Sequence, residues 1–392
     1  MKWNKSQMDG AGGLSKKTLS NVVILTGREL EITRGYLVIE DGMIKEISEG
    51  SPQSRAVDLK GGFIMPPFVN AHTHVVDSVA KELYLGRSQP QVVGPSGVKF
   101  KALESTSPAV AKQATKATLK EMLATGTIAH CDFREGGVAG VDFLRRISCS
   151  PLKSIILGRF SRTEEIPALL SRADGIGLPS LAIFSEDEME EAAAAAHRAG
   201  KLLAAHVAEN AEEMAAYRNK HHRSEVEQAI KLNCSFVVHA THCTEEEFLK
   251  LKANGIPVVF CPRSNSLLGV GVPRIDLALK TGVEFFFGTD NVMTCQPDMF
   301  DEVSFAWRCL RRVDTSAGSE EARRLLLAAT INPLEFFKLP WGPVEEGQTA
   351  TFLVLARKNN LLHLSDVYAG LVNRARVDNI REIYCGGKII IS

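Results

Sequence analysis

The chain has 392 residues, 45% of them apolar and 23% charged, a composition that predicts a globular protein with a large core and excludes a disordered or fibrous chain. Its 46 basic residues balance its 46 acidic residues, so the net charge of zero favours neither nucleic acid nor a membrane surface as a partner. We therefore expect a small-molecule partner.

Two further features of the composition concern the compartment. The eight cysteines are scattered along the chain, several of them inside apolar runs, which favours reduced thiols over a disulfide framework. No uninterrupted run of about 18 apolar residues predicts a membrane span. We expect a cytoplasmic protein with no membrane partner.

The two ends of the chain differ in pattern from its centre. Residues 1–17 are polar and glycine-rich, and we expect them to form a loose tail. Residues 18–61 and 341–392 show short alternating strands with glycine-centred turns such as "EDGM" and "CGGK". We expect these two flanks to pack together as one small β-sandwich domain.

Residues 62–340 alternate between short apolar runs and longer amphipathic stretches. The eight candidate strands are "FIMPPFVNAH", "GTIAHCDF", "LKSIILGRF", "GLPSLAIF", "KLLAAHVAE", "CSFVVHATH", "IPVVFCPRSN" and "VEFFFGTDN". Capping signals bound the helices between them, as where Thr244 and Glu247 precede Gly255. Eight such units predict an α/β fold, a (β/α)8 TIM barrel, and an open doubly wound sheet is the alternative.

Polar side chains follow several of these strands at the point where each strand ends. His72 and His74 are two residues apart at the end of the first strand, so their side chains project to the same side. His206 ends the fifth strand, His239 the sixth and Asp290 the eighth. Because the C-terminal ends of barrel strands meet at one face, where catalytic groups lie, we expect these side chains to converge there.

Imidazoles with a carboxylate suit a borderline divalent ion such as zinc or ferrous iron. Such an ion lowers the pKa of a bound water to about 7. Asp290 suits the roles of ligand and base, and Glu209, three residues after His206, is placed to shuttle a proton. His239 is a candidate to polarise the attacking water or the developing oxyanion.

Four other residues are candidates for contact with a substrate. Arg134 and Arg159 follow the second and third strands and would suit a carboxylate or phosphate, with a structural ion pair as the alternative. His242 and Asn265 also lie near strand ends, where they contact substrate or support a loop. The polar stretch "YRNKHHRSEVEQ", which includes His221, is expected to be solvent-exposed.

Five motifs, "PPFVNAHTH", "HVAE", "VVHATH", "CPRSN" and "GTDN", follow one another in this order. This set of motifs resembles that of the amidohydrolase superfamily. Within the superfamily it resembles the deaminase and chlorohydrolase branch, which includes cytosine, guanine and S-adenosylhomocysteine deaminases. The resemblance implies one metal ion, zinc or alternatively iron, with the ligands His72, His74, His206 and Asp290. It implies that Glu209 is the proton shuttle and His239 the second catalytic histidine. The binuclear branches bridge two metals with a carboxylated lysine at the end of the fourth strand. The stretch "DGIGLPSLAIFSED" contains no lysine, so the resemblance favours one metal.

The predicted activity is hydrolysis of a non-peptide carbon–nitrogen bond, namely hydrolytic deamination of an aminated heterocycle of purine, pyrimidine or pterin type. In this scheme a metal-bound hydroxide attacks the amidine carbon, Glu209 protonates a ring nitrogen, and ammonia leaves. A cyclic amide or imine hydrolase of the same superfamily and a non-catalytic binding protein are the alternatives. The sequence does not identify the substrate, and a homodimer is the default expectation for a soluble oligomer.

Overall fold

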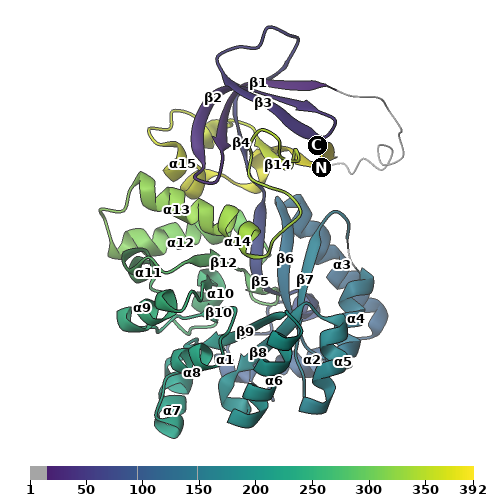
Figure 1. Cartoon of the computed structure of the whole chain (residues 1–392), viewed down its shortest axis with the longest axis vertical. Coiled ribbons are helices and arrows are strands. Elements are labelled where there is room, and N and C mark those ends of the chain that lie inside the picture. The colour runs from purple at the N-terminus through teal and green to yellow at the C-terminus, as the bar shows by residue number, and fades with distance from the viewer. Residues whose placement is uncertain (1–15, 95, 148) are drawn as a thin grey trace. The chain divides into compact units, whose positions relative to one another are not determined.

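The computed structural model describes residues 16–94, 96–147 and 149–392, which divide into two compact units (Figure 1). The first unit is made of residues 16–69, Leu123–Ile128 and Ala317–Ser392, and the second contains most of the chain between them. The predicted tail, residues 1–17, lies outside the described residues except for its last two. Lys17 is not part of a tail, because it begins the first strand and pairs with Ile39.

The first unit contains one seven-stranded sheet built from both chain ends, as predicted, in the order β16-β15-β14-β4-β1-β2-β3. The strands are β1 (Lys17–Thr26), β2 (Glu31–Glu40), β3 (Met43–Glu49), β4 (Val57–Met65), β14 (Phe352–Leu355), β15 (Ile380–Cys385) and β16 (Lys388–Ile391). A bridge between Met43 and Thr349 joins β3 to the segment before β14. The sheet therefore curls around one core, in which Leu37 and Phe352 belong to the same cluster.

The boundaries of the first unit differ from the predicted ones. Strand β4 continues past residue 61 because Gly62, Phe63 and Ile64 pair with β1. Residues 317–340 also belong to this unit. The unit's helices are α13 (Ser319–Ala329), α14 (Ile331–Phe336) and α15 (Val367–Arg374), with 3-10 turns η5 (Asn359–Leu361) and η6 (Val377–Asn379).

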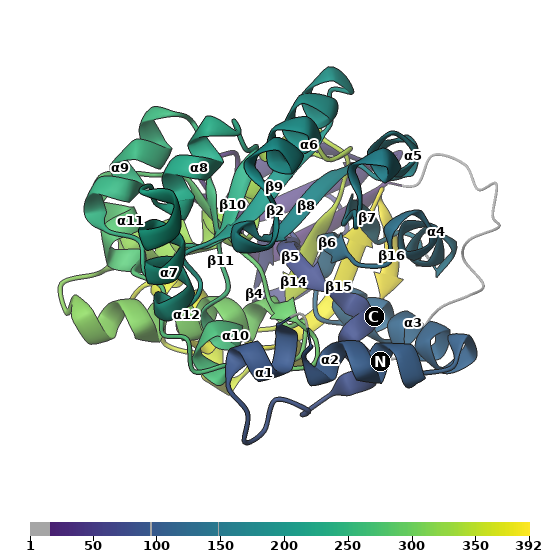
Figure 2. The ribbon, with the colours of Figure 1, turned by 90° about the horizontal axis from the view of Figure 1, so that it is seen from below.

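The second unit confirms the predicted barrel of parallel strands (Figure 2). Its strands are β5 (Phe68–His74), β6 (Thr127–Arg134), β7 (Lys153–Gly158), β8 (Gly175–Ser180), β9 (Leu202–Val207), β10 (Phe236–His239), β11 (Val258–Phe260), β12 (Phe285–Phe287) and β13 (Asp290–Asn291). The last two are pieces of the eighth predicted strand. Because β12 pairs with β11 and β13 pairs with β5, the ring of strands closes.

The first predicted barrel strand, "FIMPPFVNAH", is divided between two strands. Strand β4 ends at Met65 and β5 begins at Phe68, with Pro66 and Pro67 between them. Proline has no backbone N–H to donate to a sheet, so two in succession interrupt strand pairing. Only the part after the prolines contributes to the barrel.

Helices alternate with the barrel strands and surround them in Figure 2. They are α1 (Gln89–Val93), α2 (Val98–Ser105), α3 (Pro108–Ala124), α4 (Gly137–Ile147), α5 (Ile166–Arg172), α6 (Glu186–Arg198), α7 (Ala211–His221), α8 (Glu225–Lys231), α9 (Glu245–Ala253), α10 (Pro262–Leu267), α11 (Ile275–Thr281) and α12 (Met299–Val313). Short 3-10 turns are η2 (Val75–Ala80), η3 (Thr163–Glu165) and η4 (Leu181–Ile183). The predicted cap at Thr244 and Glu247 is present as a capping box.

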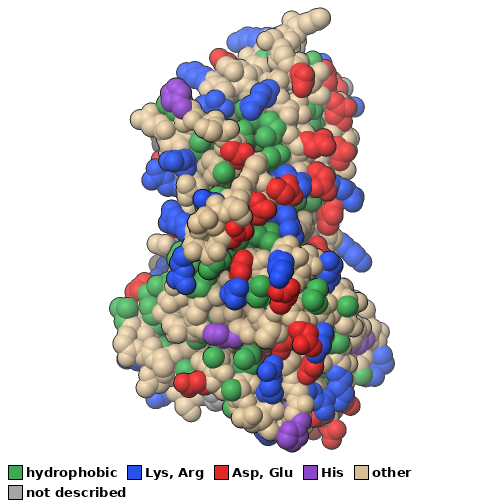
Figure 3. All heavy atoms as spheres, turned by 90° about the vertical axis from the view of Figure 1, so that its left-hand side faces the viewer, with side chains coloured by type: hydrophobic (Ala, Val, Ile, Leu, Met, Phe, Trp, Pro, Cys, Tyr) green, Lys and Arg blue, Asp and Glu red, His purple; other side chains and the backbone are tan. Residues whose placement is uncertain are grey.

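The composition has visible consequences in the structure. Acidic and basic side chains are interspersed on the face shown in Figure 3. All eight cysteines are free thiols. No helix in the described part of the chain combines the length and apolar character that a membrane crossing requires.

Candidate metal and active site

The strand ends that carry the predicted ligands are held by hydrogen bonds between neighbouring strands. Asn70 donates to the Thr289 hydroxyl at 2.7 Å and accepts from the Thr289 amide at 3.0 Å, which joins β5 to the segment before β13. His239 and Asp290 adopt φ angles of 73° and 57°. Such left-handed conformations are unfavourable for residues other than glycine and are found where function fixes a side chain.

The structure brings the predicted ligands together at the C-terminal ends of the strands. The Nε2 atoms of His72 and His74 lie 3.2 and 3.5 Å from Oδ1 of Asp290. The ring centroid of His206 lies 4.9 Å from that of His72. His239 is also close, with its ring centroid 5.1 Å from that of His206. Four imidazoles and one carboxylate from four strands therefore form one cluster.

Hydrogen bonds orient these groups. The Nδ1 atom of His206 lies 2.9 Å from the carbonyl oxygen of Leu178, so an Nδ1–H donor leaves Nε2 as a free lone pair. On Asp290, Oδ2 accepts a hydrogen bond from the Ser264 hydroxyl at 2.6 Å, while Oδ1 faces His72. The donor atoms thus point inward, toward one another.

The electrostatics of the cluster favour the ligand forms of His72, His206 and Asp290. Burial and Lys99 act to lower the pKa of His74, but the contacts with Glu135 and Asp290 outweigh them and raise it. Burial lowers the pKa of His72 to about 3 and that of His206 well below its ordinary value, so both imidazoles are neutral at pH 7. Burial acts to raise the pKa of Asp290. The contact with His72 and the nearby His239 and His74 outweigh it and hold that pKa well below its usual range.

This donor set fits a divalent metal ion. His72 is 0% exposed, and neither of its ring nitrogens makes a well-aligned hydrogen bond within the described chain. Such a buried polar group requires a partner, and a cation would supply it. Ligand atoms of His72, His74 and Asp290 lie within 4.8 Å of one another, as do those of His72, His206 and His239. Nitrogen donors with one carboxylate suit zinc or ferrous iron.

Glu209 lies beside this cluster. Its Oε2 atom is 3.6 Å from Nε2 of His239, whose Nδ1 atom lies 3.1 Å from the amide oxygen of Asn265. Burial raises the pKa of Glu209, which favours the protonated form of the carboxyl. Glu209 is therefore placed to exchange a proton with a group bound beside the cluster.

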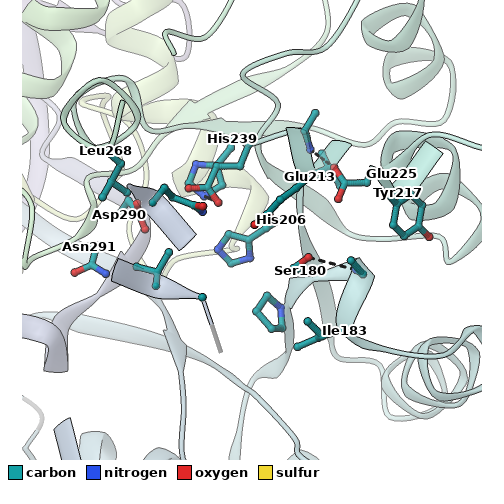
Figure 4. A pocket seen from close by; sticks show the side chains of 18 of the residues that line it. Ser180, Ile183, His206, Glu213, Tyr217, Glu225, His239, Leu268, Asp290 and Asn291 are labelled. Atoms are coloured by element: carbon teal, nitrogen blue, oxygen red, sulfur yellow. Dashed lines mark hydrogen bonds and ion pairs between the residues drawn. The ribbon is translucent and has the colours of Figure 1, made fainter. Parts of the chain in front are cut away.

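A cavity of about 330 Å³ opens next to these side chains. His206, His239 and Asp290 line one part of it, and Glu213, Tyr217 and Glu225 line another (Figure 4). The volume is within the range of small-molecule sites.

The four predicted substrate contacts are placed differently from one another. Arg159 lines the cavity. Arg134, His242 and Asn265 are absent from the cavity lining in the described chain. Arg134 pairs with Glu135 at 2.9 Å, and Nε2 of His242 lies 2.6 Å from the carbonyl oxygen of Val270. Their side chains hold neighbouring groups of the protein.

Two groups of lining residues were missed in the sequence. The expected exposure of His221 is wrong, because His221 lines the cavity and its ring stacks on Tyr217 at a centroid distance of 4.3 Å. The spacing of Glu213, Tyr217 and His221 by four residues each was a signal for a shared helix face. Lys99 also lines the cavity, beside Glu135, which was predicted near the end of the second strand, and no local pattern indicates the position of Lys99.

Comparison with known proteins decides the family. The model of the amidohydrolase family matches residues 63–390. The chain belongs to the amidohydrolase family. The predicted superfamily is thereby confirmed, and this amidohydrolase is a hydrolase that acts on carbon–nitrogen bonds.

Relatives of this amidohydrolase include a putative aminohydrolase of Methanothermobacter thermautotrophicus, 32% identical over 95% of this chain and 98% of the relative. A 5-methylthioadenosine/S-adenosylhomocysteine deaminase of Bacillus cereus is 24% identical over 96% of this chain and 94% of the relative. An adenosine deaminase of Xanthomonas campestris with bound zinc has a similar structure, with a TM-score of 0.82, 18% identity, and coverage of 95% of this chain and 92% of the other. The predicted deaminase branch is confirmed by these similarities.

Proposed function

We propose that this amidohydrolase is a deaminase with a single metal ion, acting on an aminated heterocycle of purine, pyrimidine or pterin type. The observation that carries the proposal is the position of Glu209 on the cavity wall, 3.6 Å from His239 and close to the metal-type donor set. Deamination requires a proton for the ring nitrogen and for the departing ammonia, and a carboxyl with a raised pKa is suited to deliver it.

His72, His74, His206 and Asp290 are the residues that would hold the ion in this proposal. We propose zinc, with iron as the alternative, because the zinc-bound adenosine deaminase shares the fold and the donor types suit both metals. When bound, the ion would supply a Lewis acid that makes water nucleophilic at neutral pH.

The chain's own residues then divide the remaining work. Asp290 accepts the proton of the attacking water, and its second oxygen stays fixed by Ser264. Glu209 passes a proton to the ring nitrogen of the heterocycle. The amide oxygen of Asn265 accepts from Nδ1–H of His239, which leaves Nε2 of the neutral imidazole as an acceptor that polarises the attacking water.

The test is release of free ammonia from a panel of aminated purines, pyrimidines and pterins, measured for the wild type and for Glu209→Gln. We expect ammonia from at least one member, and a turnover reduced by about 100- to 10,000-fold in Glu209→Gln with its metal content unchanged. The matched control is Glu104→Gln, an exposed glutamate, which should behave as wild type. Full turnover in Glu209→Gln would contradict the mechanism, and hydrolysis without ammonia would favour the cyclic amide alternative.

We further propose a cytoplasmic location, which the eight free thiols support because reducing compartments keep cysteines unpaired. The proposed partner is a small molecule, consistent with the size of the cavity and the zero net charge. A homodimer stays a prediction.

A further inference from the structure

Five charged side chains lie together next to His74, at the side of the cavity formed by α2, β6 and β7. The ammonium group of Lys99 contacts Asp77 at 2.7 Å and Glu135 at 2.6 Å. Arg134 contacts the other oxygen of Glu135 at 2.9 Å. Lys99 is 3% exposed and Asp77 0%, so these ion pairs are shielded from water.

The charges of the other four side chains balance without Arg159. Lys99 and Arg134 neutralise Asp77 and Glu135, and Arg159 adds a further positive charge. Arg159 makes no ion pair with any carboxylate in residues 16–94, 96–147 and 149–392, although it is partly buried and lines the cavity. A partly buried guanidinium that faces a cavity and contacts no carboxylate is suited to bind an anionic group of a ligand.

The environment of Arg159 includes an aromatic ring on one side of the guanidinium. Its guanidinium carbon lies 5.9 Å from the ring centroid of Phe100, which also lines the cavity. An aromatic ring on one side restricts the guanidinium to a narrow range of orientations and leaves its N–H edge available.

Glu135 is the carboxylate that would otherwise neutralise Arg159, because it lines the same cavity. Both of its oxygens are engaged, Oε1 by Lys99 and by Nδ1 of His74 at 3.4 Å, and Oε2 by Arg134. Lys99 reaches it from α2, the helix that also carries Phe100. One helix thus supplies the cation that holds Glu135 and the ring that flanks Arg159.

We propose that Arg159 binds an anionic substituent of the substrate, a carboxylate or a phosphate, and that Lys99 keeps Arg159 free for it by holding Glu135. Arg159 is then a substrate-binding residue and Lys99 a specificity-determining positioning residue. The inference rests on the proposed function only in assuming that the substrate contains a heterocycle. The anionic substituent follows from the charges around the cavity.

The test measures binding by calorimetry, so it does not depend on turnover. Metal-loaded protein in a Glu209→Gln background is titrated with matched probes: adenosine, cytidine and guanosine, their 5′-monophosphates, and their 5′-carboxylates. We expect at least one anionic probe to bind about 10- to 100-fold more tightly than its uncharged partner. The phosphate and carboxylate series show which anion the site takes.

Four variants assign this preference to residues. Arg159→Gln should abolish it, and Lys99→Met should weaken it about tenfold because Glu135 is released toward Arg159. Lys99→Arg keeps the cation and should retain the preference, which guards against a folding defect in Lys99→Met. Arg162→Gln, an exposed arginine in the same loop, is the control and should bind as wild type.

Each contrary result overturns a stated part of the proposal. Equal binding of all charged and uncharged partners would overturn the anion site, and so would a preference that survives Arg159→Gln. A preference that survives Lys99→Met would overturn the role of Lys99 alone. Absence of ammonia in the activity assay would instead count against the proposed deaminase function, so the two failures are distinguishable.

Discussion

Asp290 illustrates how a single side chain combines several constraints. Its backbone is left-handed at φ 57°, one oxygen accepts a hydrogen bond from Ser264, and the other faces two histidines. The unfavourable backbone and the buried carboxylate both cost free energy that a bound cation would offset. The same cation explains why buried histidines surround a carboxylate at this position.

Loss of a ligand should therefore remove metal and activity together. We expect Asp290→Ala and His206→Ala to lower metal affinity by at least about 100-fold. Replacing a residue that only orients a metal ligand already lowers affinity by about 10- to 100-fold. Elemental analysis after dialysis measures this. His197→Ala, an exposed histidine on α6, is the control and should retain its metal. Wild-type metal content in both ligand variants would show that the ion is held elsewhere.

Glu225 should make stability depend on pH. Burial raises its pKa to about 7, with contributions from Glu213, Glu209 and Glu247, against the hydrogen bond from the Ala208 amide. A carboxyl whose pKa is raised in the folded state binds its proton more tightly there. Stability from this group is present below the unfolded pKa of 4.5 and is lost as pH rises to about 7.

Glu225→Gln should remove that loss. Between pH 5 and pH 8 we expect the free energy of unfolding of the wild type to fall by up to about 3 kcal/mol more than that of the variant. The melting temperature of the wild type should therefore fall more than that of the variant. Glu104→Gln serves as the exposed control. An equal change in melting temperature for wild type and Glu225→Gln would contradict the assignment to this group.

At the residue scale, the sequence predicted the groups that follow strand ends and missed those that arrive from elsewhere. His72 and His206 could be placed together because parallel strands in a barrel share one C-terminal face. Lys99 could not be placed, because its contacts with Asp77 and Glu135 depend on how α2 packs. Long-range ion pairs leave no periodic signal in the sequence.

Among the elements, the helices with complete start signals were the easiest to predict. Helix α9 begins where the Thr244 hydroxyl accepts from the Glu247 amide at 3.2 Å and the Glu247 carboxylate accepts from the Thr244 amide at 2.9 Å. These bonds satisfy donors that the first turn of a helix leaves free.

Thr244→Ala should remove half of this cap. We expect a loss of about 1 kcal/mol in stability, seen as a melting temperature lower by about 2 °C, with turnover unchanged. Thr244→Ser keeps the hydroxyl and should match the wild type. A melting temperature equal to wild type in Thr244→Ala would show that the capping bond contributes nothing to stability.

Elements without such signals were predicted less well. The apolar run around Pro66 and Pro67 predicts one strand, and the structure divides it because neither proline can donate to a sheet. The eighth strand is interrupted at Gly288, where an added Cβ would lie 2.7 Å from atoms of His72. Close backbone approach of this kind depends on the closed ring and has no local sequence signature.

For the molecule as a whole, hydrophobic patterning was sufficient to predict a barrel and a separate sheet from both chain ends. It was not sufficient for the boundaries, because residues 317–340 pack with the first unit through contacts distant in sequence. The cavity likewise required the assembled barrel, since its lining residues come from many separate segments.

The central claim is that one divalent ion sits among His72, His74, His206 and Asp290. The most direct test is elemental analysis of protein purified without chelators or added metal. We expect about one zinc or iron per chain. About two metals per chain, or none even after reconstitution with zinc and iron, would contradict it.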